Sequence, residues 1–351
     1  MKKLTILILA ASVLPTGASA EALWMRDVKI SPDGTRIAFE YKGDIFTVPA
    51  TGGMATRLTT NPAYDSNPIW SPDGKSIAFA SARHGNFDVY VMPSVGGTAT
   101  RLTRNQAAEI PEAFSPDGRT VYFSAAIQNP AQSAMFPSSR MSEFYAVGVE
   151  GGKPRQVLGT PAQMPTFSAD GNVMLYQDVK GFEDEWRKHH TSSVTRDIWM
   201  VDFTTGKHTN LTDRPGEDRN PVLDPATGAV YFLSERDGDT FNVWTFPLGA
   251  PDKAERITDF KTHPVRFLSR SADGKMAFTY DGSIYTLADG GKPVKLTVEA
   301  VTDDADQKEV RNVKAAGGVV SPDGKMVAFT DRGDVFVTSV EYPTTVQVTH
   351  T

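Results

Sequence analysis

The sequence contains no cysteine among its 351 residues. This absence excludes disulfide bonds, thiolate metal ligands and a cysteine nucleophile. The chain also has only six histidines, and it lacks the Gly-x-Ser-x-Gly, His-Glu-x-x-His and P-loop patterns of common hydrolases and nucleotide-binding enzymes. We therefore expect no locally encoded catalytic site, no cofactor and no metal. A Ser-His-Asp set assembled from distant repeats stays open as a disfavoured alternative.

Positive charge is also scarce. The chain carries 36 Lys and Arg against 42 Asp and Glu, which gives a net charge of −6. A nucleic-acid partner requires a basic face that replaces condensed counterions, so this balance argues against one. The hydrophobic content of 40% is that of an ordinary globular protein.

The only long apolar run lies at the N-terminus. Lys2 and Lys3 precede the apolar residues 4–14, and the small residues Ala-Ser-Ala follow at 18–20. This order is typical of a secretory signal peptide, and the run is shorter than the roughly 20 residues of a membrane-spanning helix. We predict a signal peptide at 1–20, cleavage near Ala20, and a periplasmic or secreted protein without a membrane span.

No segment has a sustained helical stripe, whereas internal repeats dominate the chain. The tetrapeptide Ser-Pro-Asp-Gly begins at Ser31, Ser71, Ser115 and Ser321. Looser copies begin at Ser168, Asp224 and Ser271. Proline presets the backbone of such a turn and glycine ends it, so each copy is expected to join two short strands.

Each repeat holds four short runs rich in β-branched and aromatic residues, separated by turns. Examples from the second repeat are the runs 67–70, 77–79, 88–90 and 100–103, with Gly96-Gly97 before the last. Four strands per repeat at this spacing are the signature of a β-propeller. Coils of a β-solenoid are shorter and lack four turns, so that alternative is disfavoured.

The repeats do not follow one another evenly. Six run to about Thr297, and a charged stretch then precedes the seventh. We predict a six-bladed propeller at 21–297, a charged linker at 298–317, and an isolated blade at 318–351 that begins a second propeller. The alternative is one seven-bladed ring.

These repeats resemble the TolB-type propellers, which share the Ser-Pro-Asp-Gly turn. As an ordered set, the strings resemble more closely the N-terminal region of tricorn-type peptidases. The strings that carry the resemblance lie at 24–25, 41–46, 61–65, 84–90, 181–186, 189–190, 216–220 and 332–336.

The tricorn-type resemblance implies a large serine peptidase that acts on short peptides. Two propellers would be followed by a PDZ-like module and by catalytic domains related to tail-specific proteases. The first propeller of such an enzyme is not catalytic but forms a pore near the active site. The expected partners are therefore short peptides and the downstream PDZ-like and catalytic domains, and a homo-oligomer stays open.

Two repeats carry long insertions before their third strand, at 126–142 and 180–196. Insertions of this kind project from one face of a propeller, where binding residues tend to lie. A guanidinium can hold a carboxylate through two hydrogen bonds, and the resemblance implies a basic anchor for a peptide's carboxylate. The predicted substrate contacts are Arg140, Glu183, Asp184, Arg187, His189 and His190.

Four alternatives accompany these predictions. The insertions could be solvated loops that pack on each other or on another domain. The His189-His190 pair could suggest a metal, but adjacent side chains point in different directions, which disfavours one. The chain could also be a free-standing periplasmic TolB-like interaction propeller, or the propeller of a dipeptidyl-peptidase-type enzyme.

Overall fold

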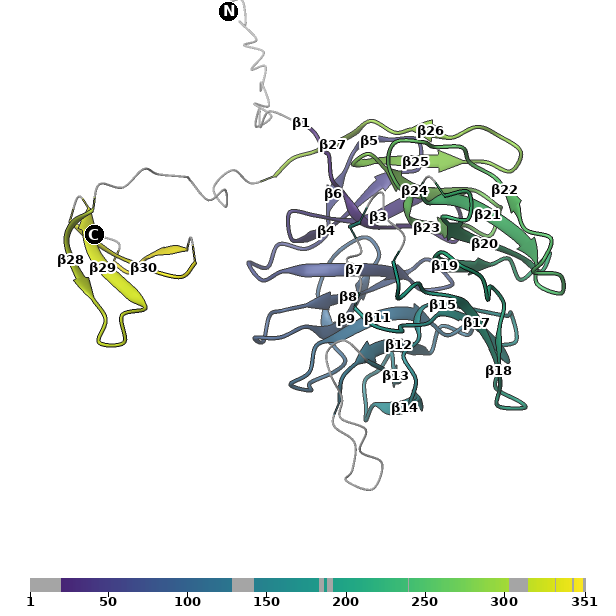
Figure 1. Cartoon of the computed structure of the whole chain (residues 1–351), viewed down its shortest axis with the longest axis horizontal. Helices are drawn as coiled ribbons and strands as arrows, with labels where there is room; N and C mark the ends of the chain where they lie inside the picture. The colour runs from purple at the N-terminus through teal and green to yellow at the C-terminus, as the bar shows by residue number, and fades with distance from the viewer. Residues whose placement is uncertain are drawn as a thin grey trace, which may run out of the picture. The chain divides into compact units, whose positions relative to one another are not determined.

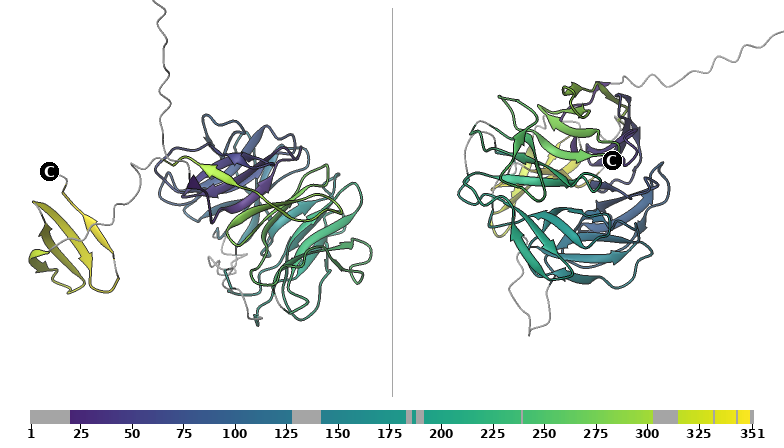
Figure 2. Two further views of the ribbon diagram at one scale, coloured as in Figure 1. Left: turned by 90° about the horizontal axis from the view of Figure 1, so that it is seen from above. Right: turned by 90° about the vertical axis from the view of Figure 1, so that its right-hand side faces the viewer.

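The computed structural model describes residues 20–127, 142–182, 186–187, 192–238, 240–302, 315–331, 333–342 and 344–349. All secondary-structure elements within these ranges are β-strands. Six four-stranded antiparallel sheets surround a common axis as the blades of a propeller (Figures 1 and 2). The predicted all-β propeller is confirmed. Within the same ranges no helix has the length and hydropathy that a membrane crossing requires.

Each blade is built from consecutive strands, and its first strand lies nearest the axis. The strands of the first three blades are β2 (Arg26–Ile30), β3 (Arg36–Tyr41), β4 (Asp44–Pro49) and β6 (Thr56–Arg57); β7 (Asp65–Trp70), β8 (Ser76–Ser81), β9 (Asp88–Pro93) and β10 (Thr100–Arg101); and β11 (Glu109–Phe114), β12 (Thr120–Ala125), β13 (Glu143–Gly148) and β14 (Arg155–Leu158).

The remaining three blades repeat this order. Their strands are β15 (Gln163–Phe167), β16 (Val173–Gln177), β17 (Ile198–Asp202) and β18 (Lys207–Asn210); β19 (Asp218–Leu223), β20 (Ala229–Ser234), β21 (Asn242–Pro247) and β22 (Glu255–Arg256); and β23 (Arg266–Arg270), β24 (Met276–Tyr280), β25 (Ser283–Leu287) and β26 (Val294–Lys295).

The ring closes after six blades. Strand β2 of blade 1 packs directly against β23 of blade 6, and the Ile30 N–H donates to Ser269 Oγ at 3.0 Å. The alternative of a single seven-bladed ring is therefore wrong. The seventh repeat forms its own sheet of β28 (Ala316–Val320), β29 (Met326–Asp331), β30 (Asp334–Ser339) and β31 (Thr345–Gln347) in a separate compact unit.

A small three-stranded sheet joins the two ends of the ring. Strand β27 (Val298–Ala300) lies between β1 (Ala20–Glu21) and β5 (Gly53–Met54), antiparallel to β1 and parallel to β5. Gly52 fits at this junction because a Cβ there would lie 2.7 Å from the Thr297 carbonyl oxygen. Its φ of 84° also favours glycine.

The predicted linker therefore needs correction at both ends. Residues Val298–Ala300 are a strand of the first unit, which ends at Val301, because the Val298 side chain is buried under blade 1. Strand β28 begins at Ala316, before the predicted end of the linker. The charged composition indicated a boundary between two units in this region. It did not indicate the residues at which the flanking strands end and begin.

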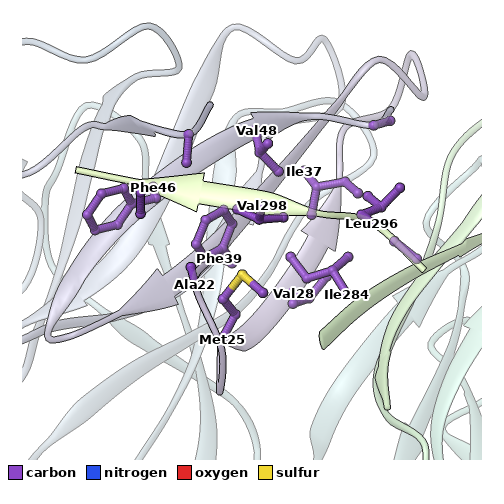
Figure 3. Close-up of a cluster of buried hydrophobic side chains, with 14 of the residues drawn as sticks. Ala22, Met25, Val28, Ile37, Phe39, Phe46, Val48, Ile284, Leu296 and Val298 are labelled. Carbon is purple, nitrogen blue, oxygen red and sulfur yellow. The ribbon is translucent and has the colours of Figure 1, made fainter. Parts of the chain in front are cut away.

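The hydrophobic core is divided among the six interfaces between neighbouring blades. The cluster at the interface of blades 6 and 1 contains Phe39 and Phe46 from blade 1, Ile284 and Leu296 from blade 6, and Val298 from β27 (Figure 3). Five further clusters occupy the other interfaces. Side chains alternate across a strand, so each sheet contributes to the clusters on both of its sides.

The Ser-Pro-Asp-Gly turns share one hydrogen-bond pattern. In blade 3, Ser115 Oγ donates to Asp117 Oδ1 at 2.5 Å and accepts the Thr120 N–H at 3.0 Å. Asp117 Oδ1 also accepts the Arg119 N–H at 3.1 Å. The hydrogen bond from Ser115, followed by the backbone one, lowers the pKa of Asp117. The turn is thus held by the ionised carboxylate.

A Ser115→Ala substitution tests this turn. The folded-state pKa of Asp117 lies below its unfolded value, so its contribution to stability is present above the unfolded value and disappears as the pH falls through the folded one. Urea unfolding at pH 7 should show a loss of stability in the variant, and this loss should shrink towards pH 2. Thr160→Ala, at an exposed position, is the control. A pH-independent difference would contradict the account.

A Phe39→Ala substitution tests ring closure. Phe39 is fully buried in the closing cluster, and removing a buried phenylalanine side chain costs about 3–5 kcal/mol. The free energy of unfolding of the propeller, measured with denaturant, should fall by this amount. Val340→Ala is the control, because that side chain is 61% exposed and the change should stay within about 0.5 kcal/mol.

Candidate functional site

The predicted substrate contacts divide into two groups. Arg187 belongs to the described part of the chain. The other five lie outside the described residues and stay predictions: Arg140, Glu183, Asp184, His189 and His190. The described part of the candidate site consists of the inner strands and of Trp186 and Arg187 from the second insertion.

The six first strands enclose a central channel with two cavities. The cavity on the side of the Ser-Pro-Asp-Gly turns has a volume of about 590 Å³. The second, about 480 Å³, lies towards the opposite face, beside residues that flank the first insertion. Glu112 and Met164 line both cavities and mark the narrow part between them.

A repeated backbone feature shapes this narrow part. In five blades the first strand contains a β-bulge and one non-glycine residue with a positive φ, between 49° and 56°. A left-handed conformation is uncommon for such residues and marks sites where the surrounding structure fixes the backbone. The five residues are Asp27, Asn67, Met164, Asn220 and Phe267.

Blade 3 departs from this pattern because proline cannot adopt a positive φ. Pro111 stands at the equivalent position, and the bulge falls between Pro111 and Ala113. The next residue, Glu112, accepts hydrogen bonds from Ser124 Oγ at 2.6 Å and from the Met164 N–H at 3.0 Å. Glu112 thus connects blades 3 and 4 at the narrow part of the channel.

Lys29 is the basic side chain next to the narrow part. It lines the larger cavity together with Glu112. Burial lowers the pKa of Lys29, and the charges of Asp27 and Glu112 oppose that shift. An ammonium group in this setting can attract an anionic ligand group.

Apolar side chains form most of the remaining wall of the larger cavity. Trp70, Phe114 and Phe167 line it. Each also belongs to or packs against a cluster between blades. Prolines of the turns, Pro32, Pro72, Pro116 and Pro225, stand around its outer part.

Trp186 of the blade-four insertion lies against blades 1 and 6. The guanidinium carbons of Arg26 and Arg266 are each 4.9 Å from the centre of its ring. Its ring centre is also 6.0 Å from that of Phe267. A side chain of blade 4 therefore covers part of the channel at the face opposite the Ser-Pro-Asp-Gly turns.

Arg187 anchors this segment. Its Nη2 donates to Glu217 Oε2 at 2.6 Å, and its Nη1 donates to Glu235 Oε2 at 2.8 Å. Its backbone carbonyl accepts a hydrogen bond from Arg266 Nη2 at 3.0 Å. The side chain is only 3% exposed. In this structure Arg187 holds the insertion in place, and its guanidinium is already engaged by carboxylates.

Glu217 is the centre of the buried charge cluster. It is fully buried, and its Oε1 accepts a hydrogen bond from Arg196 Nη1 at 2.8 Å. Burial acts to raise the pKa of Glu217, but Arg219, Arg196 and Arg187 outweigh it, so the pKa is lowered. A carboxylate in this position is stable only because arginines surround it.

Removing Arg187 should destabilise the propeller. An Arg187→Ala substitution leaves Glu235 and one oxygen of Glu217 without a cation, and breaking a buried ion pair costs about 3–5 kcal/mol. The free energy of unfolding, measured with urea at pH 7, should fall towards the lower end of this range because Arg196 remains. Lys253→Ala, at an exposed position, should leave it unchanged. A loss below about 1 kcal/mol would contradict the anchoring role.

The described residues of the channel include charged and apolar side chains. They contain no group of three or more His, Asp or Glu side chains suited to a metal ion. Lys29, Glu112 and the apolar cavity wall can instead hold an extended ligand with a charged end.

Comparison with known proteins identifies the family of this chain. Residues 22–293 match the family described as the tricorn protease N-terminal beta propeller domain. The chain belongs to this family. The propeller is also similar in structure to the tricorn protease, with a TM-score of 0.68 and 21% identity, over 94% of this chain and 32% of that chain.

Two further proteins are similar to this chain, one in sequence and one in structure. A TolB homologue from Chlorobium luteolum is 33% identical over 76 residues, which cover 22% of this chain and 17% of the relative. A structure of the nidogen/laminin complex has a TM-score of 0.55 at 12% identity, over 76% of this chain and 97% of that chain. This member of the tricorn propeller family thus spans about a third of the tricorn protease chain and a smaller share of the TolB homologue.

Sequence reasoning missed several residues of the channel. Lys29, Glu112 and the left-handed residues were not singled out as candidates. Aligning the first strands of the repeats would have placed Asp27, Asn67 and Asn220 at one position. The contact of Trp186 with blades 1 and 6 had no signal in the sequence, because the partners lie far apart along the chain.

Proposed function

We propose that this chain is the non-catalytic, peptide-guiding propeller region of an exported tricorn-like serine peptidase that processes short peptides. The membership of the tricorn propeller family supports this proposal. The observation that carries it is the channel, where Lys29 and Glu112 stand among apolar side chains and Arg270 is paired with Asp224 near the turns.

The chemistry of the channel suits the end of a peptide. Aromatic and aliphatic side chains such as Trp70 and Leu268 can receive apolar residues of a peptide. Lys29 can attract its terminal carboxylate, since an ammonium removed from water gains most from an opposite charge. Arg140 and the predicted contacts of the blade-four insertion would add to this site from the opposite face.

The wider context follows from the same proposal. The partners would be short peptides and a downstream PDZ-like module with catalytic domains. The seventh blade would begin a second propeller, because its exposed side chains Val319 and Val320 occupy positions that are buried or half-buried in the other six blades. We further infer that the signal at 1–20 directs the chain to the periplasm or outside the cell.

Peptide binding by the chain tests the proposal. Fluorescence anisotropy with labelled penta- to octapeptides should detect binding, and Lys29→Gln should weaken it about tenfold for a free C-terminal carboxylate but not for the amidated peptide. Lys292→Gln, at an exposed position, is the matched control. Incubation with the same peptides should yield no cleavage products. Equal binding of both peptide forms, or turnover by this chain alone, would overturn the proposal.

An alternative is a free-standing periplasmic interaction propeller of the TolB kind. The identity of 33% with a TolB homologue over 76 residues favours it. Protein partners would then bind, while short peptides would show no dependence on Lys29. Recovery of a defined envelope protein together with failed peptide binding would favour this alternative.

A further inference from the structure

Blades 2 and 5 contain the same buried unit of an acid, an arginine and two aromatic rings. In blade 2, Arg83 Nη2 donates to Asp65 Oδ2 at 2.9 Å. Its guanidinium carbon lies 5.4 Å from the Phe79 ring centre and 5.1 Å from that of Tyr90. The fully buried Asp65 is thereby neutralised by an arginine that lies over an aromatic pair.

Blade 5 builds this unit from equivalent positions. Arg236 Nη2 donates to Asp218 Oδ2 at 3.1 Å. Its guanidinium carbon lies 4.9 Å from both the Phe232 and the Trp244 ring centres. In both blades the acid begins the first strand, the arginine follows the second strand by two residues, and the rings come from the second and third strands.

Blade 3 has this unit without its arginine. Glu109 begins the first strand, and it is paired with Ala125 as Asp65 is with Ser81. Phe123 and Tyr145 stack with ring centres 5.6 Å apart. The position of the arginine, two residues after the second strand, is occupied by Ile127.

A cavity lies where the arginine is missing. It has a volume of about 490 Å³, and its wall includes Glu109, Ile127 and Tyr145. Arg104 and Lys153, both exposed, contribute to its rim. The cavity sits at the interface of blades 2 and 3, away from the residues that line the central channel.

Glu109 is left incompletely satisfied at this cavity. Its side chain is fully buried, and Oε1 has no partner with hydrogen-bond geometry among the described residues. Oε2 accepts the Asn105 N–H at 3.2 Å. Burial and the nearby Asp88 raise the pKa of Glu109, against hydrogen bonds from Thr103 and Asn105. A buried carboxyl group without a cation is costly, so a bound cation would stabilise it.

We propose that this cavity is a binding site for the guanidinium group of an arginyl side chain supplied by a ligand peptide. The ligand's guanidinium would take the place that Arg83 and Arg236 occupy in the other blades, against Glu109 Oε1 and the Tyr145 ring. This inference goes beyond the peptide-guiding role of the channel and does not depend on Lys29.

The unit itself explains why a guanidinium fits better than an ammonium. A planar guanidinium stacks on aromatic rings and donates several hydrogen bonds at once, whereas an ammonium is a compact, strongly hydrated charge. The basic rim at Arg104 and Lys153 would repel a ligand that carries only positive charge. It favours an arginine whose own carboxylate lies at the rim, as in a peptide with a C-terminal arginine.

Titration with Nα-acetyl-L-arginine tests the site, with Nα-acetyl-L-citrulline as a neutral ligand of the same shape. Isothermal titration calorimetry on the full chain should detect binding of the arginine compound. The citrulline compound should bind at least tenfold more weakly. Glu109→Gln should reduce the arginine association at least tenfold. Ile127→Arg should abolish it by filling the cavity and should also raise Tm, while Ile127→Met should retain it.

Two further variants separate the remaining explanations. Arg83→Ala creates a second site of the same kind in blade 2, and the arginine compound should raise its Tm more than it raises that of the parent chain. Loss of binding in Glu109→Gln and Ile127→Arg distinguishes this site from the channel, which neither residue lines. Lys292→Gln, at an exposed position, should leave binding unchanged. Equal affinity for citrulline, or binding that survives Glu109→Gln and Ile127→Arg, would overturn the proposal. Binding seen only in Arg140→Gln would do so too, because the chain would then fill its own site.

Discussion

The packing of each blade against its neighbours is the interaction on which this structure depends. Every core cluster lies between two blades, so no blade has a complete core of its own. Strand β3 illustrates the reason, because Phe39 faces blade 6 while the adjacent Ala38 faces blade 2. Burial of both faces requires a closed ring, and the sheet of β1, β5 and β27 fastens the interface at which the chain's two ends meet.

The closed ring also creates the functional surfaces. Six inner strands around one axis leave a channel, and their bulges set residues such as Asp27 and Met164 at its narrow part. Charged groups in such places need partners, which Glu112 finds in blade 4 and Arg187 finds in blade 5. Cross-blade contacts of this kind fix the channel wall and the blade-four insertion at the same time.

The blades repeat one arrangement of residues, so a blade that departs from it indicates a functional position. Pro111 stands where the five other blades have a left-handed residue, and Glu112 follows it in the channel. Ile127 replaces an arginine and leaves Glu109 beside a cavity. Among the described residues, Glu109 has no arginine against it as Asp65 and Asp218 do. In the seventh sheet, Val319 and Val320 are exposed at positions that are buried or half-buried in the six blades of the ring.

The sequence by itself determined the all-β class, the number of repeats and the break before the seventh, because turn chemistry and strand alternation are local properties. It also indicated the tricorn family through strings such as 41–46. Tertiary structure alone decided that β27 belongs to the ring, that Trp186 lies between Arg26 and Arg266, and that Arg187 is buried. These facts depend on residues that are distant along the chain, and their contacts arise only when six blades close around one axis.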